Sequence, residues 1–300
     1  MIPDYQTLMK PVLSLAAEGE LKISDAIERL SGEFGLSPEE RAELLPSSGQ
    51  TVIYNRAQWA KTYLKQAGLV EPTRRGYVRI TDAGREVLKN SPDRLDVKFL
   101  RTIPTFINHV PKTRSNASNL IDDTEETNAT PEELLREAFD KIASSIAIEL
   151  LDRLRSGTPA FFERAIVALL LAMGYGGSSE DAGRAIGQSG DDGVDGVIDQ
   201  DPLGVDQIYI QAKRYAEGNQ VGPGAIRDFF GSLSLKKAQK GIFVTTSGFS
   251  KSAIETARQI GARIVLIDAQ QLGRLMVRHN VGCRDQEILH VKRIDEDFFE

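Results

Sequence analysis

Apolar residues recur at helical spacing through the first part of the chain. The clearest case is residues 54–67, where Trp59, Tyr63 and Ala67 fall in one row. Side chains three and four residues apart share one face of a helix, so this row is expected to pack inward. Similar patterns predict helices over residues 5–18, 24–30, 37–45 and 54–67, the second of them capped by Ser24.

A different pattern follows the fourth helix. Residues 70–80 alternate apolar and polar around Arg74-Arg75-Gly76, which predicts a two-stranded hairpin, and residues 81–85 then open a closing helix. Helices followed by a basic hairpin are typical of a winged helix-turn-helix, which places one helix in the major groove of DNA. Residues 1–90 are therefore predicted to form a mostly α-helical winged-helix DNA-recognition domain. Protein-interaction domains share this arrangement and are the alternative.

Charge is distributed unevenly along the chain. Residues 55–85 contain seven basic and two acidic side chains, whereas residues 120–140 contain eight acidic side chains and one arginine. The net charge of the whole chain is −6, so contact with DNA has to come from a local basic patch rather than from a global field. A solvated surface without a partner is the alternative. The predicted DNA contacts are Arg56, Lys61, Lys65, Arg74 and Arg75.

The middle of the chain is predicted to join two domains. Residues 91–130 lack apolar periodicity and hold prolines, asparagines and acidic residues, which is typical of a linker. Residues 95–110 hold some apolar side chains, so this stretch forms a short strand or packs on a neighbouring element. A capping box from Thr130 to Glu133 then starts a long helix that runs to about residue 154. We assign residues 91–157 to this linker and helix. The helix is long enough to act as an arm or a dimer contact, or it packs on the second domain.

Strands and helices alternate in the last part of the chain. A helix that begins at Thr158-Pro159 is apolar nearly all round, so it is expected to be buried. Glu163 lies in its first turns, and a buried carboxylate is costly unless it is paired or functional. The whole order predicts an α/β domain over residues 158–300, with parallel later strands covered by helices. The predicted strands cover residues 193–198, 207–213, 241–246 and 263–268, and the helices between and after them cover residues 224–235, 250–260 and 269–280.

Neighbouring strands carry the candidate catalytic residues. Side chains alternate faces along a strand, so Gln211 and Lys213 point the same way. Asp195 follows the glycine- and aspartate-rich turn at residues 190–194, and its carboxylate converges with them if it lies on the same face. Mg²⁺ is often held by one or two carboxylates together with water and substrate phosphate. In the predicted phosphodiester hydrolysis Asp195 holds the metal, Lys213 positions the attacking water and balances charge at phosphorus, and Glu163 is a further acidic partner.

Other interpretations of these segments differ in strength. A calcium loop of the EF-hand type starting at Asp191 would need an oxygen ligand and a glutamate where the chain has Gly193 and Pro202, so it is excluded. A plain turn between strands is the alternative for the acidic turn, and a polar-x-Lys triplet alone occurs in many edge strands. Residues 245–250 join a strand to a helix, so they either bind a phosphate at the helix N-terminus or cap the core.

Composition narrows the setting of the protein. The chain has 300 residues, enough for two domains, and its one cysteine, Cys283, has no second thiol for a disulfide or a zinc site. A reducing, cytoplasmic location is expected. There is no signal-peptide pattern and no apolar stretch long enough to cross a membrane. The expected cofactor is Mg²⁺, with Mn²⁺ as a substitute, and no nucleotide is expected.

Several motifs together resemble the Mrr-type restriction endonucleases, over nearly the whole chain. The resemblance implies an N-terminal Mrr winged-helix domain and a C-terminal PD-(D/E)xK nuclease domain, whose mixed sheet is flanked by helices. The motifs are Phe161-Phe162-Glu163, Gly174-Tyr175-Gly176, Asp191-x-Gly193-x-Asp195-Gly196, Gln211-Ala212-Lys213 and the run from Gly241 to Phe249.

The resemblance also implies an activity. Members of this type IV class cut double-stranded DNA that carries methylated bases, and double-strand cleavage with one centre per chain implies a homodimer or larger assembly. By position, Asp195 matches the family's metal-binding aspartate, Gln211 and Lys213 its Q-x-K motif, and Glu163 its helix glutamate. Asp192 departs from a frequent glycine, which adds charge beside the metal site. The alternative is a DNA-binding or regulatory protein with an inactive nuclease-like domain.

Overall fold

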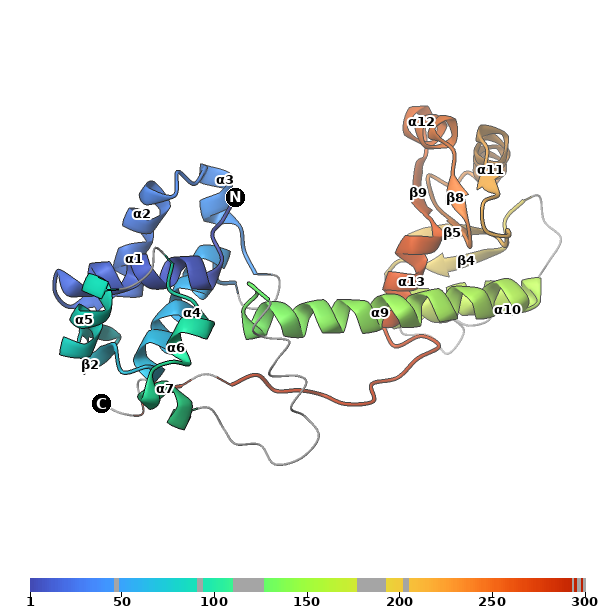
Figure 1. Cartoon of the computed structure of the whole chain (residues 1–300). Coiled ribbons are helices and arrows are strands. Elements are labelled where there is room, and N and C mark those ends of the chain that lie inside the picture. The colour runs from blue at the N-terminus through green and yellow to red at the C-terminus, as the bar shows by residue number, and fades with distance from the viewer. Residues whose placement is uncertain are drawn as a thin grey trace. The chain divides into compact units, whose positions relative to one another are not determined.

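The computed structural model describes residues 1–45, 49–90, 94–109, 127–176, 193–201, 205–292, 294–295 and 298. The chain divides into two compact units, Met1–Ala138 with Lys292–Glu300, and Phe139–Val291 (Figure 1). The boundary falls inside the long helix α9 (Pro131–Ser156), so the two ends of this helix belong to different units.

Helix α4 (Val52–Gln66) is central to the first unit. It packs against α1 (Tyr5–Ala17) and α2 (Ile23–Glu33). Trp59 and Tyr63 are partly buried against the core and Ala67 is buried, so the predicted inward row is confirmed. The remaining elements before residue 91 are β1 (Leu21–Lys22), α3 (Pro38–Ala42), β2 (Val70–Arg74), β3 (Tyr77–Ile80) and α5 (Asp82–Asn90).

The predicted hairpin is present. Strands β2 and β3 pair antiparallel, and β1 pairs with the other side of β3, which gives the order β1-β3-β2. Gly76 in the turn has φ +74°, a left-handed conformation that glycine adopts without steric cost. The following helix α5 completes the predicted order of helices, hairpin and helix.

The start of α2 differs from the prediction. The helix begins at Ile23, and Lys22 occupies the cap position without a side-chain hydrogen bond. Ser24 therefore lies inside the first turn, and its hydroxyl donates to Asp25 instead of capping the helix. Strand β1 ends at Lys22, so the chain passes directly from strand to helix and the cap position falls on a strand residue whose side chain does not cap.

Part of the predicted linker belongs to the first unit. Residues 94–109 contain α6 (Val97–Leu100) and α7 (Pro104–His109). Leu95, Leu100 and Phe106 are buried in the same core as α1 and α4. Burial of these apolar side chains stabilises a segment that shows no periodicity in the sequence. Four of the eight acidic residues counted in residues 120–140, namely Asp122, Asp123, Glu125 and Glu126, lie outside the described residues.

Helix α9 confirms the predicted long helix. The backbone N–H of Thr130 donates to Glu133 Oε2 at 2.7 Å and the N–H of Glu133 donates to Thr130 Oγ1 at 3.4 Å, so the capping box is formed. Leu150, Leu151 and Leu154 near its C-terminus are buried in the core of the second unit. In the described part of the chain, neither α9 nor another helix is long and apolar enough to cross a membrane.

The second unit is built on a four-stranded mixed sheet. Its strands are β4 (Gly196–Asp199), β5 (Gln207–Lys213), β7 (Lys240–Thr245) and β9 (Arg263–Ile267), in the order β4-β5-β7-β9. β4 is antiparallel to β5, while β5, β7 and β9 are mutually parallel, as predicted for the later strands. A two-stranded sheet of β6 (Gln220–Val221) and β8 (Gly248–Phe249) lies outside this order.

Helices cover both faces of the sheet (Figure 1). The end of α9 packs on one face with α10 (Pro159–Ala172) and α13 (Ala269–Arg278), over alternate strand residues such as Ile210 and Val244. Helices α11 (Pro223–Leu235) and α12 (Lys251–Gln259) pack on the other face around Phe243. The mixed sheet flanked by helices is confirmed.

Candidate active site

Asp195 lies one residue before β4, beside the part of β5 that carries Gln211. Its backbone N–H donates to the carbonyl oxygen of Ile210 at 2.8 Å, which continues the β4–β5 ladder. Its carboxylate Oδ2 accepts hydrogen bonds from the side-chain amide of Gln211 and, at 2.7 Å, from the backbone N–H of Ala212. Two donors on one oxygen fix the orientation of this carboxylate. The structure thus brings together two of the three predicted catalytic residues.

Gly193 lets the chain pass close to Ser232 just before Asp195. Its φ is +82°, in the left-handed region. A Cβ atom at this position would lie 2.9 Å from Ser232 Oγ and 3.8 Å from Gln211 Oε1. Both the backbone conformation and the lack of space therefore require glycine. The preceding Asp191 and Asp192 lie outside the described residues.

Glu163 reaches the same region from α10. This helix is capped by Thr158, with Pro159 at its first position, as predicted. Burial raises the pKa of Glu163, the charge of Asp195 raises it further, and Arg164 opposes both. Because a carboxylate beside another carboxylate disfavours its charged form, the two acids form one electrostatic unit. Glu163 and Asp195 line a recess with about 10 Å³ of free space, together with Ile166, Val167, Gly196, Ile210 and Ala212.

Lys213 ends β5 on the face that carries Gln211. Ile210 and Ala212 pack toward α9, α10 and α13, and Tyr209 packs toward α11 and α12, so the predicted alternation along β5 is confirmed. Gln211 is only 4% exposed. Lys213 is partly exposed, does not line the recess, and has no side-chain hydrogen bond or ion pair among the described residues.

The donors for a metal ion are few. Where the chain is described, no group of three or more His, Cys, Asp or Glu side chains is placed to hold one. Asp195 Oδ1 and the Glu163 carboxylate have no hydrogen-bond partner among these residues, so oxygens of both acids remain available. Two carboxylates with free oxygens match Mg²⁺ or Mn²⁺, which complete their coordination with water and substrate.

The turn at residues 245–250 is held by internal hydrogen bonds. Thr246 Oγ1 donates to the carbonyl oxygen of Tyr215 at 2.7 Å and accepts from its N–H at 2.9 Å. Thr245 Oγ1 donates to the Lys213 carbonyl oxygen at 2.8 Å. Ser250 Oγ accepts from the N–H of Ala253 at 3.1 Å and caps α12. These contacts favour the interpretation of the turn as a cap on the core.

Arg56 is engaged inside the first unit. Its Nε donates to Glu133 Oε1 at 3.0 Å and its Nη1 donates to the carbonyl oxygen of Ile2 at 2.8 Å. The Arg56 and Glu133 side chains are only 21% and 16% exposed. This predicted DNA contact therefore links α4 to the start of α9 and to the N-terminal segment.

The other predicted DNA contacts lie nearer to solvent. Arg74 is exposed, pairs with Glu20 at 2.8 Å and places its guanidinium 3.8 Å from the centre of the Tyr77 ring. Arg75 and Lys65 are exposed and Lys61 is partly exposed. These residues lie on the hairpin and on α4, so they come from the two elements for which DNA contact was predicted.

Two arginines near the site were not among the predicted residues. Arg214 directly follows Lys213, and its side chain donates to the carbonyl oxygens of Arg155 and Gly157. Arg155 in turn donates to the carbonyl oxygen of Thr246. No spacing rule in the sequence reveals these contacts, because their acceptors are backbone atoms of distant segments. The only sequence signal is the position of Arg214 next to the Q-x-K motif.

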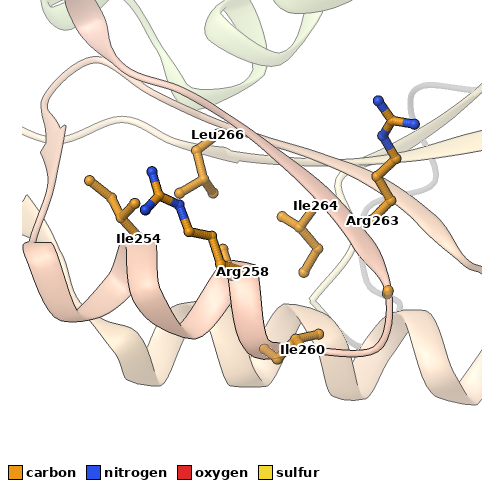
Figure 2. A pocket seen from close by; sticks show the side chains of 8 residues that line it. Ile254, Arg258, Ile260, Arg263, Ile264 and Leu266 are labelled. Atoms are coloured by element: carbon orange, nitrogen blue, oxygen red, sulfur yellow. The ribbon is translucent and has the colours of Figure 1, made fainter.

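A separate groove lies between α12 and β9, the edge strand of the sheet (Figure 2). Its volume is about 390 Å³. Ile254, Arg258 and Ile260 line it from the helix side, and Arg263, Ile264 and Leu266 line it from the strand. No acidic side chain lines this groove, so it offers no carboxylate for a metal.

Comparison with known proteins finds a matching family model in each of the two units. Residues 154–276 match a family model described as restriction endonuclease, and residues 5–90 match the Mrr N-terminal domain. The type IV methyl-directed restriction enzyme EcoKMrr of Escherichia coli (strain K12) is 34% identical over 308 residues, covering 100% of this chain and 99% of that protein.

Two solved structures show weaker likeness. The MspJI restriction endonuclease in complex with a 27-mer oligonucleotide is 20% identical with a TM-score of 0.36, covering 62% of this chain and 40% of that one. The DNA modification-dependent restriction endonuclease AspBHI is 17% identical with a TM-score of 0.33, covering 72% and 56%.

Proposed function

This chain belongs to the Mrr family of type IV restriction endonucleases, and on that premise we propose that it is a divalent-metal-dependent enzyme that cleaves methylated double-stranded DNA. One observation carries the proposal. The Asp195 carboxylate is fixed by Gln211 and Ala212, and it shares a recess with Glu163. We include DNA methylation in the proposal because the relative from E. coli, which is similar over its full length, is a methyl-directed enzyme.

The residues present fit Mg²⁺ or Mn²⁺. Asp195 and Glu163 would hold the ion, since both residues line one recess and each has a carboxylate oxygen without a hydrogen-bond partner in the described part of the chain. The charge of Asp195 also raises the pKa of Glu163. A cation removes this repulsion between carboxylates. When bound, a divalent ion supplies Lewis acidity at the phosphoryl oxygen and lowers the pKa of the attacking water.

The other residues have separate tasks. Gln211 orients Asp195 by donating to its Oδ2, which leaves Oδ1 for the ion. Lys213 would orient the attacking water and stabilise the negative charge that develops at phosphorus, because its ammonium is not committed to another side chain in the described parts of the chain. The apolar walls of the recess, including Ile166 and Val167, limit access of further water.

We further propose that the first unit is a winged-helix reader of DNA. The support is its order of helices, hairpin and helix, and the placement of Lys65 and Arg75 on exposed parts of α4 and the hairpin turn. Cleavage of both strands with one nuclease centre per chain requires a dimer or larger assembly. Arg56 is left out of this reader surface because its guanidinium is used within the unit.

Cleavage of matched plasmids tests the function. Plasmids that differ only in adenine or cytosine methylation are incubated with the full chain and Mg²⁺, Mn²⁺ or EDTA. We expect metal-dependent cleavage of a methylated plasmid and sparing of the unmodified one. Asp195→Ala and Lys213→Ala should each abolish cleavage with an unchanged circular dichroism spectrum.

Lys251→Ala is the matched lysine control. Lys251 is exposed at the start of α12 and lines neither recess nor groove. Full activity of both site variants would refute the assigned roles. Lack of cleavage by the wild-type chain on every plasmid and metal would favour a DNA-binding protein with an inactive nuclease-like domain.

A further inference from the structure

Arg214 ties the end of β5 to the turn between α9 and α10. Its Nη1 donates to the carbonyl oxygen of Arg155 at 2.5 Å and to that of Gly157 at 2.6 Å. Arg155 lies in the last turn of α9 and Gly157 is the first residue beyond the helix. Such carbonyl oxygens have no intrahelical partner, and a cation at a helix C-terminus also interacts favourably with the helix dipole. The side chain next to Lys213 thus caps α9.

The side chain of Arg155, in turn, bonds from the end of α9 back to the turn that follows β7. Its Nε and Nη2 donate to the carbonyl oxygen of Thr246 at 3.1 and 3.0 Å. The backbone N–H of Thr246 donates to the carbonyl oxygen of Lys213 at 3.4 Å. The Arg155 side chain is only 20% exposed and also pairs with Asp152 at 3.1 Å. The two arginines therefore form a reciprocal link between the end of α9 and the strand ends around Lys213.

The turn that receives these contacts is tight. A Cβ atom at Gly157 would lie 2.7 Å from Cδ1 of Phe161 and 3.3 Å from the carbonyl oxygen of Arg153. Thr158 follows at once and caps α10 by accepting from the N–H of Phe161 at 3.1 Å. Glu163 comes two residues after Phe161. A shift of the turn is therefore transmitted to Glu163 without a flexible segment in between.

We propose that Arg214, together with Arg155, is a positioning residue that holds α10, and with it Glu163, in place relative to the strand end that carries Lys213. The inference rests on the proposed function, in which Glu163 and Lys213 act on one phosphate. Arg214 acts through the turn and not on substrate. A displacement of about 1 Å is enough to cost on the order of 100-fold in rate.

The test combines kinetics with hydrogen exchange of the full chain. We expect Arg214→Ala to lower kcat on methylated plasmid by about 10- to 100-fold with KM within about twofold of wild type. The amides of residues 159–165 should exchange faster in the variant, without added metal or DNA, while those of β7 keep their protection. Arg214→Lys keeps a cationic donor and should recover part of both effects.

Arg153→Ala is the control on the same helix. Arg153 is 73% exposed and pairs with Glu149 four residues away, so its removal should leave kcat and exchange unchanged. Gly157→Ala alters the same turn without changing charge. It should reproduce the fall in kcat and the faster exchange of residues 159–165.

Several outcomes would overturn the inference. They are a wild-type kcat for Arg214→Ala, a higher KM with unchanged kcat, which indicates direct DNA contact, and equal loss of protection in β7, which indicates general destabilisation. A wild-type chain that cuts no DNA refutes the proposed function instead. The exchange of residues 159–165 then decides by itself whether Arg214 holds the turn.

Discussion

The side-chain amide of Gln211 donates a hydrogen bond to Oδ2 of Asp195. Gln211 therefore acts as a hydrogen-bond donor to the Asp195 carboxylate. A glutamate could not donate in its ionised form, and the position is only 4% exposed. Glutamine at this position therefore keeps Asp195 oriented when no cation neutralises it.

Gln211→Glu should make the stability of the folded protein depend more strongly on bound metal. A carboxylate at the buried position 211 would face the partly buried carboxylate of Asp195, so we expect the free energy of unfolding in EDTA to fall by about 2 kcal/mol. Mg²⁺ should raise the Tm of the variant more than that of wild type, because binding to the folded state stabilises it by mass action. Thermal unfolding across a Mg²⁺ titration measures both effects.

Gln207→Glu is the matched control for that substitution. Gln207 lies on the same strand and donates to Asp199 at 3.1 Å on β4, but this pair is exposed. Water screens the new charge there, so a change below about 0.5 kcal/mol is expected. An equal loss in both variants would contradict the orienting role of Gln211.

Glu163 should make the metal-free protein less stable as pH rises. Burial and the charge of Asp195 raise the pKa of Glu163 in the folded protein above its ordinary value of 4.5. The folded state then binds a proton more tightly than the unfolded state, so stability falls as pH rises from about 4.5 through the folded pKa. Glu163→Gln removes this loss, and its Tm in EDTA should exceed that of wild type increasingly over this range.

Thermal unfolding in EDTA at a series of pH values measures the difference. Glu255→Gln on the exposed face of α12 is the control and should follow the wild-type profile. A constant Tm difference between Glu163→Gln and wild type across pH would show that the Glu163 carboxyl does not titrate abnormally. Saturating Mg²⁺ should reverse the order, because the wild-type chain has both carboxylates for the ion.

Gly193→Ala tests the close approach beside Asp195. The φ of +82° strains a side-chain residue, and the new Cβ would meet Ser232 Oγ at 2.9 Å. We expect a loss of about 1 to 2 kcal/mol in the free energy of unfolding and a large fall in cleavage rate. Gly193→Ala with Ser232→Ala removes the contact but leaves the backbone strain, so it should recover only part of the stability. Full recovery would show that the contact alone requires glycine.

The sequence was sufficient to predict the buried face of elements in which many residues follow a regular pattern. The row of Trp59, Tyr63 and Ala67 predicted a face of α4, and alternation along β5 predicted which side carries Gln211. The packing of residues 94–109 could not be predicted in this way. Helices of four and six residues are too short to show periodicity, so only the fold reveals that Leu100 and Phe106 are buried.

Contacts between segments far apart in the chain also could not be predicted from the sequence. Charge counts identified Arg56 as part of a basic patch, but its acceptor Glu133 is 77 residues further along the chain. Arg214 likewise bonds to carbonyl oxygens 59 and 57 residues away. Backbone acceptors carry no residue type that a motif could contain. Asp195 and Glu163 could be named as candidate metal donors from the sequence, because Mg²⁺ favours carboxylate oxygens, and their role as metal ligands stays a prediction.

Arg56 and Lys65 on α4 should separate stability from DNA binding. Arg56→Ala leaves Glu133 without its ionic partner in a largely buried position and removes the bond to the Ile2 carbonyl oxygen. We expect a loss of about 2 kcal/mol in the free energy of unfolding, with little change in the salt dependence of DNA affinity. Lys65→Ala should leave stability within about 0.5 kcal/mol and reduce the slope of log affinity against log salt by about 1.

Denaturant unfolding and fluorescence anisotropy on a duplex at several salt concentrations measure these two properties separately. Glu133→Gln is the partner control, because it weakens the ion pair from the other side and should reproduce part of the stability loss of Arg56→Ala. A salt slope that falls for Arg56→Ala as much as for Lys65→Ala would return Arg56 to the DNA-contacting set. The burial of its guanidinium against Glu133 and the N-terminal backbone argues for the opposite result, since a cation held there has few donors left for a phosphate.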